Sequence, residues 1–249
     1  MIIQLHFYIL LRQKITIMSK IIMFGNQKGG VGKSQVSIMV ATALSQSPFN
    51  LNVCVLDTDN QKSVLNSRIF DLRAYQTETQ PFAVIDTKVS EMQKNIGGLD
   101  KDYDVIIIDA AGKLDNEQPI ETQEITKILM YVDFLFIPFV AGSHNLNATF
   151  KYLQFVRKVQ ETRQLQARNL KAFGFVNMFR SRSKSNGFLA EDIEVLKASE
   201  SLLMMSTALN DYSLFRDADT ITSIYIPLST DSAKANFTTF LNEILSIIN

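Results

Sequence analysis

The stretch that decides the fold is GNQKGGVGKS, residues 25–34. It follows the short apolar run KIIMFG at 20–25, and a helical pattern extends over 33–46. Glycines tolerate positive φ angles and let the backbone approach a ligand closely. Successive N–H groups of such a loop, together with the N-terminus of the next helix, form a cradle for phosphate oxygens. The order of strand, glycine-rich turn and helix therefore predicts a phosphate-binding loop.

Polar side chains in this loop predict how a nucleotide and its metal ion are held. Lys33 would bring a positive charge to the β- and γ-phosphates, and Ser34 would offer a hydroxyl to Mg²⁺. The strict pattern G-x-x-x-x-G-K-[ST] is not met at its first position, where Gln27 stands. Lys28 is a second lysine in the loop, and it either has a role of its own or is a solvated surface residue.

Residues 28–34, KGGVGKS, resemble the deviant Walker A motif of the ParA/MinD/Soj family of P-loop ATPases, in the form typical of ParA-like partition ATPases. In that family the early lysine crosses a dimer interface to the phosphates of the partner's ATP. The resemblance implies this role for Lys28, whose charge would neutralise the transferring phosphoryl group of the other subunit. It also implies that ATP contacts Gly29, Gly30, Val31, Gly32, Lys33, Ser34 and Gln35.

Short apolar, β-branched runs alternate with helical patterns along the rest of the chain. The predicted strands are 20–25, 52–57, 82–86, 103–109, 133–138, 171–177 and, less clearly, 202–206. The predicted helices are 33–46, 61–74, 88–96, 118–131, 145–165, 187–199, 211–219 and 232–248. Nearly continuous apolar runs suit strands buried on both faces of a parallel sheet. The sequence therefore predicts an α/β protein with the P-loop NTPase fold, a doubly wound, mostly parallel sheet of about seven strands with helices on both faces.

Acidic side chains follow the second predicted strand, in the run NVCVLDTDNQKS at 52–63. Asp57 and Asp59 are two residues apart, so their side chains share a face while the chain stays extended. ParA-like proteins commonly carry D-x-D-P-Q here, and this chain has Asn60 in place of the proline. The resemblance implies that Asp57 helps to hold the Mg²⁺ shell and that Asp59 is catalytic, orienting the attacking water. The alternative is that one of the two caps the helix that begins near Asn60.

The run YDVIIIDAAG at 103–112 resembles a Walker B strand. Asp109 ends its apolar part, where a carboxylate can bind Mg²⁺ through water, and a capping role alone is the alternative. Many relatives carry D-x-P-P at this point, and D-A-A-G is nearer to the D-G-A-G form of small plasmid partition ATPases. The resemblance implies that the amide of Gly112 reaches the γ-phosphate. The predicted magnesium site thus combines Ser34, Asp57 and Asp109.

Two later segments bear on the base and on membrane binding. FGFVNMFRSRS at 173–183 resembles the strand and loop that hold the adenine edge in ParA-like proteins, where the residue matching Asn177 lies near the base. The alternative is an ordinary asparagine in a strand-end turn. TFLNEILSII at 239–248 has apolar residues at helical spacing but lacks the Lys/Arg face of a membrane-targeting helix such as that of MinD. It predicts a core-packing helix, and no membrane is expected as a partner.

Basic residues are concentrated in one part of a chain whose formal net charge is zero. Eight lie between residues 157 and 184, and Glu161 is the only acid there. Such a surface can hold DNA by neutralising phosphates without reading the sequence, which is also what the resemblance implies. The alternative is a solvated helix face followed by a basic loop. The DNA-binding candidates are Arg163, Arg168, Lys171, Arg180, Arg182 and Lys184.

Composition indicates one domain over residues 18–249, because the 249-residue chain has no low-complexity tract or Pro/Gly linker. Residues 1–17 are interpreted as a non-native or disordered extension, with an extra edge strand or a membrane-touching segment as alternatives. Cys54 is the only cysteine, which argues against iron–sulfur and Cys-rich zinc sites and fits a reducing cytoplasm. No helix-turn-helix pattern precedes residue 19, as expected of the small type of ParA-like protein.

Together these features predict a cytoplasmic, nucleoid-associated ATPase that uses ATP and Mg²⁺ to segregate a plasmid, chromosome or mobile element. The resemblance implies an ATP-dependent homodimer that binds DNA nonspecifically. It also implies a ParB-like centromere-binding partner that stimulates hydrolysis and so releases the dimer from DNA. An ATPase of conjugative transfer and a MinD-like positioning ATPase remain alternatives. A nitrogenase iron protein or a cluster scaffold would need paired cysteines, which this chain lacks.

Overall fold

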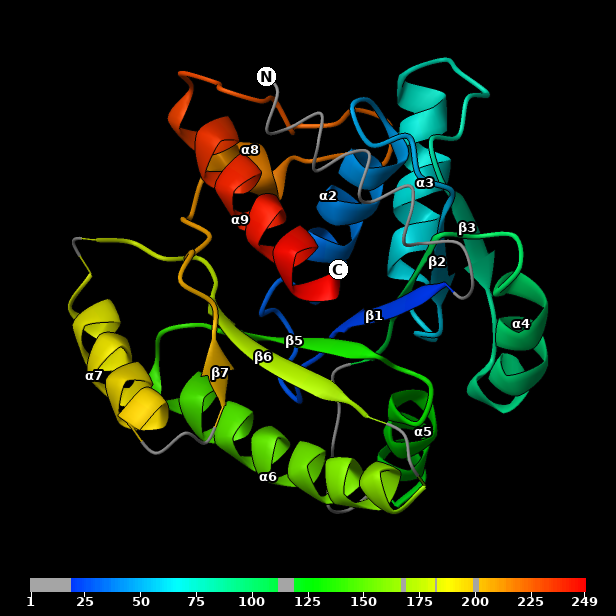
Figure 1. Cartoon of the computed structure of the whole chain (residues 1–249). Helices are drawn as coiled ribbons and strands as arrows, with labels where there is room; N and C mark the ends of the chain where they lie inside the picture. The colour runs from blue at the N-terminus through cyan, green and yellow to red at the C-terminus, as the bar shows by residue number, and fades with distance from the viewer. Residues whose placement is uncertain (1–18, 112–118, 167–168, 182, 199–201) are drawn as a thin grey trace.

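A computed structural model describes residues 19–111, 119–166, 169–181, 183–198 and 202–249. Its centre is a seven-stranded sheet in which every described strand pair is parallel, with strand order β3-β2-β4-β1-β5-β6-β7 (Figure 1). The predicted α/β class and doubly wound parallel sheet are therefore confirmed. The predicted extension over the first seventeen residues lies outside the described part of the chain.

The elements follow the predicted alternation closely. The strands are β1 (Lys20–Phe24), β2 (Val53–Asp57), β3 (Ala83–Asp86), β4 (Val105–Asp109), β5 (Phe134–Phe139), β6 (Lys171–Val176) and β7 (Leu203–Met204). The helices are α2 (Lys33–Ser45), α3 (Ser63–Ala74), η1 (Val89–Glu91), α4 (Met92–Leu99), α5 (Pro119–Leu129), α6 (Ser143–Leu165), α7 (Lys184–Ala198), α8 (Ser213–Arg216) and α9 (Ser232–Ile248).

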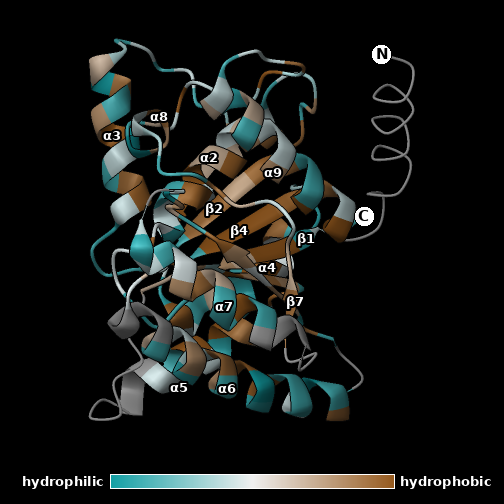
Figure 2. Ribbon diagram, turned by 90° about the vertical axis from the view of Figure 1, so that its left-hand side faces the viewer, coloured by the Kyte–Doolittle hydropathy of each residue, from teal (hydrophilic) through white to brown (hydrophobic). Residues whose placement is uncertain are grey.

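Helices cover both faces of the sheet, and each face has its own apolar core. Side chains alternate along a strand, so β1 turns Ile22 and Phe24 towards α2 and α9, and Ile21 and Met23 towards the opposite face. On that opposite face lie α4, α5, α6 and α7 (Figure 2). Strands buried on both sides need apolar residues at every position, which explains the continuous hydrophobic runs of the sequence.

The C-terminal helix α9 packs into the first core, as its apolar stripe predicts. Phe237, Phe240, Leu241 and Ile244 are completely buried there. Asp231 begins the helix by accepting a hydrogen bond from the backbone N–H of Lys234 at 2.9 Å, which satisfies one of the free donors of the first turn. The stripe is therefore occupied by the protein's own core.

The predicted helix at 211–219 is wrong in extent, because only the single turn α8 forms. The chain after it leaves the helical path and binds two neighbouring helices. The carbonyl oxygen of Ala218 accepts from the Gln35 side chain of α2 at 2.9 Å. Nε of Arg68 on α3 donates to the Thr220 hydroxyl at 3.0 Å. These contacts hold the segment after α8 against α2 and α3.

Both edges of the sheet are short. β3 has four residues at one edge, and β7 has two residues at the other, fewer than the predicted strand at 202–206. Glu243 of α9 explains the early end of β7, because its carboxylate accepts the backbone N–H groups of Ser206 and Thr207 at 2.6 and 2.8 Å. These two amides are thereby unavailable for strand pairing.

Among the described residues there is no helix with the length and apolar character needed to cross a membrane.

Candidate functional site

The phosphate loop connects β1 to α2 at the carboxyl edge of the sheet. Gly30 and Gly32 have φ angles of 76° and 87°, a left-handed conformation that favours glycine. A Cβ atom at Gly32 would also lie 2.5 Å from Nδ2 of Asn177. The glycines are thus needed for the shape of the loop, which leads its backbone into the N-terminus of α2 and creates the anion cradle expected from the sequence.

The two lysines of the loop are placed differently. The Lys33 side chain folds over the loop, and its Nζ donates to the carbonyl oxygen of Lys28 at 3.3 Å. Burial lowers the pKa of Lys33, and the nearby carboxylates of Asp109 and Asp59 oppose this shift. Lys28 is instead exposed. Lys33 therefore contacts its own loop, whereas the Lys28 side chain is exposed to solvent.

Asp109 ends β4 directly beside the phosphate loop. Its Oδ2 accepts a hydrogen bond from the hydroxyl of Ser34 at 2.8 Å, and its Oδ1 is buried without a hydrogen-bond partner. Burial raises the pKa of Asp109 to about 7, and the hydrogen bond from Ser34 opposes the shift. A buried oxygen without a partner is costly in a folded protein. A serine hydroxyl beside such a carboxylate fits an Mg²⁺ ion, which prefers oxygen ligands.

Asp57 holds the start of helix α3. Its Oδ2 accepts the backbone N–H groups of Val64 and Leu65, both at 3.0 Å, and its Oδ1 accepts the N–H of Asp59 at 3.3 Å. Burial raises the pKa of Asp57, and these backbone donors oppose the shift. The structure therefore shows Asp57 capping α3, which is the alternative considered for this pair of aspartates, and the metal role of Asp57 stays a prediction.

The loop after β2 is tied to the end of β4. Both the backbone N–H and the hydroxyl of Thr58 donate to the carbonyl oxygen of Asp109 at 2.9 Å. Asp59 is half-buried, and its carboxylate accepts the N–H of Gln61 at 2.9 Å. Lys62 closes the loop with a φ angle of 50° and an ion pair to Asp86. The loop thus brings Asp59 to the same sheet edge as Asp109.

A small cavity of about 40 Å³ lies on the other side of the phosphate loop. Gly32, Gln35 and Met39 form one wall, and Asn177 and Tyr212 belong to the opposite wall. Asn177 is buried, and its amide nitrogen donates to the carbonyl oxygen of Val31 at 2.8 Å. Asn177 therefore contacts the phosphate loop itself and lines this small cavity, and its place near the base stays a prediction.

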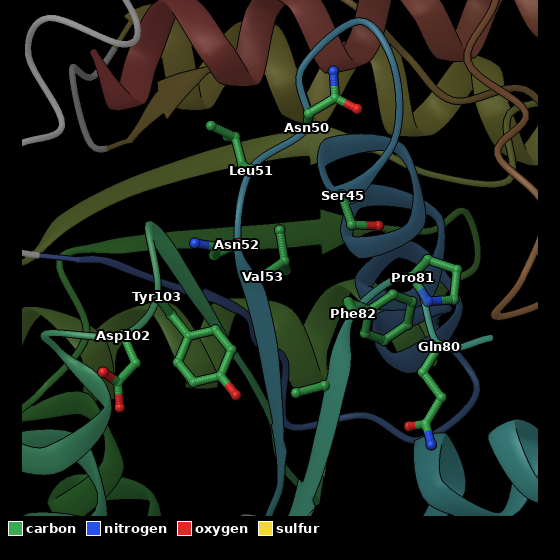
Figure 3. Close-up of a pocket in the computed structure, with 11 residues that line it drawn as sticks. Ser45, Asn50, Leu51, Asn52, Val53, Gln80, Pro81, Phe82, Asp102 and Tyr103 are labelled. Carbon is green, nitrogen blue, oxygen red and sulfur yellow. The ribbon is translucent and has the colours of Figure 1, made fainter. Parts of the chain in front are cut away.

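A larger cavity of about 520 Å³ lies at the other end of the strands, where β2, β3 and β4 begin. Figure 3 shows its walls, which include Asn52 and Val53 at the start of β2, Phe82 before β3, and Tyr103 before β4. It contains no residue of the phosphate loop. In parallel α/β sheets, ligands bind at the carboxyl ends of the strands. The cavity of Figure 3 is therefore separate from the nucleotide site.

The DNA-binding prediction is wrong for Arg163. This side chain is 3% exposed, and its guanidinium donates to the carbonyl oxygens of Leu129, at 3.0 Å, and of Val132. Tyr152, Val156 and Val159 precede it on the buried stripe of α6, at helical spacings that bring all of them to one face. Arg163 therefore closes the end of α5 from inside the protein and is not available to a polyanion.

The other basic candidates that are described lie on the surface. Lys171, Arg180 and Lys184 are exposed, and Arg180 forms an ion pair with Asp211. Three predicted site residues lie outside the described part of the chain, namely Gly112, Arg168 and Arg182.

Replacing Arg163 by methionine is expected to lower the free energy of unfolding by roughly 2 kcal/mol or more, because two buried carbonyl oxygens lose a charged donor. A DNA-binding titration should not distinguish the variant from the wild type. Lys158→Met on the same helix is the matched control, because Lys158 is exposed. Urea unfolding and a DNA-binding titration measure both effects. Normal stability with weakened DNA binding would contradict this assignment of Arg163.

Two contributors to the site were not predicted from the sequence. Asn26 and Thr149 are buried beneath the phosphate loop, and their side chains are hydrogen-bonded to each other at 2.9 Å. A polar residue directly after an apolar strand was one available signal. Another was the position of Thr149 on the stripe that includes Tyr152 and Val156.

A family model described as the CobQ/CobB/MinD/ParA nucleotide-binding domain matches residues 22–209, more than half of the chain. The chain belongs to this family. The matched region of this CobQ/CobB/MinD/ParA domain runs from β1 to the segment after β7, and it includes the phosphate loop, Asp57, Asp109 and Asn177. No curated protein sequence in the comparison matches the chain significantly.

Several solved structures share the architecture of this chain. A putative plasmid partition protein from Borrelia burgdorferi bound to AMPPNP has a TM-score of 0.64 and 20% identity, covering 92% of this chain and 99% of that one. The MinD cell division protein of Aquifex aeolicus has a TM-score of 0.62 and 13% identity, covering 92% and 98%. A Cyanothece McdA variant in complex with ATP has 0.60 and 15%, covering 92% and 95%. At these identities the likeness establishes the fold of the domain.

Proposed function

We propose that this protein is a ParA-like partition ATPase, which hydrolyses MgATP and pairs with a second copy when ATP is bound. The observation that carries the proposal is the different placement of the two lysines in KGGVGKS. Lys33 folds over its own loop, whereas Lys28 is exposed at the loop's outer surface. An exposed cation beside a phosphate cradle is suited to the nucleotide of a neighbouring subunit.

Each residue of the site has a part in this chemistry. Loop N–H groups and the N-terminus of α2 would bind the phosphates, and Lys33 would add a positive charge. Ser34 and Asp109 would hold Mg²⁺, which when bound supplies positive charge to the phosphate oxygens. Asp57 supports this edge by fixing α3, and Asp59 would orient the attacking water. The amide of Gly112 is proposed to reach the γ-phosphate.

The base and the DNA are assigned to separate surfaces. The adenine would lie beside Asn177 and Tyr212, where the cavity of about 40 Å³ would have to widen to hold a purine. We propose that Lys171, Arg180 and Lys184, with Arg168 and Arg182, bind DNA through phosphates without sequence preference. A ParB-like centromere-binding protein would then provide site specificity and stimulate hydrolysis, on the nucleoid in the cytoplasm.

The test compares DNA binding of the wild type with ATP, the wild type with ADP, and Lys28→Ala with ATP. We expect the ATP-loaded wild type to bind DNA about tenfold or more tightly than the other two samples do, because pairing doubles the basic surface. Sizing of Asp59→Ala with MgATP should reveal a stable dimer, because its hydrolysis is blocked. Equal DNA binding in all three arms would rule the proposal out.

Conjugative transfer and MinD-like positioning are the alternatives to partition. A membrane role is disfavoured by α9, whose apolar residues, including Phe240 and Leu245, are buried in the core. Co-sedimentation with liposomes that requires ATP would support a MinD-like role instead.

A further inference from the structure

Asn26 is a buried amide directly beneath the phosphate loop. It is 2% exposed, and it lies between the end of β1 and the lysine that distinguishes the loop. Its Nδ2 donates to the carbonyl oxygen of Pro138 at 2.8 Å and to the hydroxyl of Thr149 at 2.9 Å. Its Oδ1 accepts the backbone N–H of Lys28 at 3.0 Å. One side chain therefore joins β5, α6 and the phosphate loop.

These partners determine which way the amide is oriented. The carbonyl of Pro138 can only accept a hydrogen bond, so it requires the NH₂ side of Asn26. The oxygen is then directed to Lys28, whose N–H can only donate. An aspartate here would set a carboxylate against the Pro138 carbonyl, and an alanine would leave buried donor and acceptor groups without partners. The site therefore specifies an asparagine.

Helix α6 supports this arrangement from behind. Thr149 and Tyr152 are three residues apart on α6, so they share a face. Thr149 binds Asn26, and the Tyr152 hydroxyl lies where a Cβ atom of Gly25 would be. The backbone N–H of Gly25 also donates to Phe136 of β5 at 3.0 Å. Gly25, directly after β1, is thus packed between β5 and α6.

The backbone of Lys28 is held at two points. Asn26 binds its N–H, and Nζ of Lys33 binds its carbonyl oxygen. Its side chain is exposed. We propose that Asn26 is a positioning residue, which fixes the main chain of Lys28 against α6 so that its side chain is directed at the second subunit. This inference rests on the proposed function.

The first experiment measures three quantities for the wild type, Asn26→Ala and Asn26→Asp. These are ADP affinity, ATP-dependent pairing with its turnover, and thermal stability. We expect both variants to bind ADP within about threefold of the wild type, because the N–H groups at the start of α2 and Lys33 remain. Pairing and turnover should fall by about tenfold or more, because the backbone of Lys28 is no longer fixed.

Two comparisons separate positioning from a general loss of structure. Asn186→Ala is the matched control, because Asn186 is 4% exposed and its Nδ2 donates to the carbonyl oxygen of Arg180 at 2.7 Å. It should lose stability but keep pairing. Thr149→Val should weaken pairing, and Thr149→Ser, which keeps the hydroxyl, should restore it.

The outcomes are distinguishable. A wild type that does not pair on ATP contradicts the proposed function itself. If the wild type pairs and the Asn26 variants pair equally well, the positioning role is wrong. It is also wrong if ADP affinity falls as much as pairing, since Asn26 would then support the whole loop and not Lys28 in particular.

Discussion

Replacing Asp109 by asparagine is expected to lower MgATP turnover by roughly 100-fold or more in a protein that stays folded. The asparagine side chain can still accept the hydrogen bond from Ser34, but it lacks the charge that would bind the metal ion. Steady-state phosphate release measures the effect. Asp133→Asn is the matched control, because Asp133 is a partly buried aspartate at the opposite edge of the sheet, where it accepts the N–H of Ile21. The Asp133→Asn variant should hydrolyse ATP at the wild-type rate.

The same variant should change how stability depends on pH in the metal-free, nucleotide-free protein. Burial raises the pKa of Asp109 to about 7, so the folded protein holds this proton more tightly than the unfolded chain does. Below about pH 4 both states are protonated, and the favourable contribution is fully present. As pH rises to about 7 the contribution is lost, because the unfolded chain releases the proton first.

Asp109→Asn should therefore flatten this pH dependence and raise the melting temperature above pH 7. Thermal melts of the wild type and the variant between about pH 4 and about pH 8 measure the difference. This range covers both the ordinary pKa of an aspartate and the raised pKa of Asp109. Besides burial, the Asp57 carboxylate helps to raise the pKa of Asp109, so the difference between the two profiles reports on this pair of carboxylates. Parallel pH profiles, or normal turnover by the variant, would contradict the role of Asp109.

Replacing Gly25 by alanine is expected to destabilise the fold by roughly 3 kcal/mol or more, because the new methyl group enters a filled core. Its Cβ would overlap the Tyr152 hydroxyl and lie 2.7 Å from Cδ1 of Leu135. Urea unfolding measures the loss. Gly97→Ala on α4 is the control, because a Cβ there meets no other atom within 4 Å and alanine favours a helix.

A double variant makes the same prediction sharper. The Tyr152 hydroxyl is buried without a hydrogen-bond partner, so Tyr152→Phe alone should leave stability unchanged or raise it. Combined with Gly25→Ala, it removes the nearest obstacle and should recover part of the lost free energy. Strictly additive effects of the two substitutions would contradict the proposed contact, since residues in contact are expected to couple.

Much of this molecule was predictable because local patterns determine it. The phosphate loop, the strand that ends at Asp109 and the buried face of α9 follow from periodicity and motif spacing, and the structure has them where they were expected. Charge patterns were less informative. Arg163 was assigned to the surface on its charge alone, although its spacing from Val156 and Val159 already brought it to the buried face of α6.

The remaining features depend on contacts between distant parts of the chain. Asn26 meets Thr149 across 123 residues of sequence, and the Asp57 carboxylate reaches the backbone of α3 only after the loop has turned back. Local signals in the sequence indicate that these residues are placed to make polar contacts, but not which groups they bind. The short α8 likewise depends on Arg68 and Gln35, which bind the chain that follows it.

The brevity of the outermost strands has a consequence for crowded conditions. A long free strand offers a row of unpaired amides and carbonyls onto which another molecule can add, and this is a common start of aggregation. In this protein the outer strands contribute four residues and two residues. Molecules gathered at high local concentration should therefore remain separate and recoverable, without fusing their sheets into fibres.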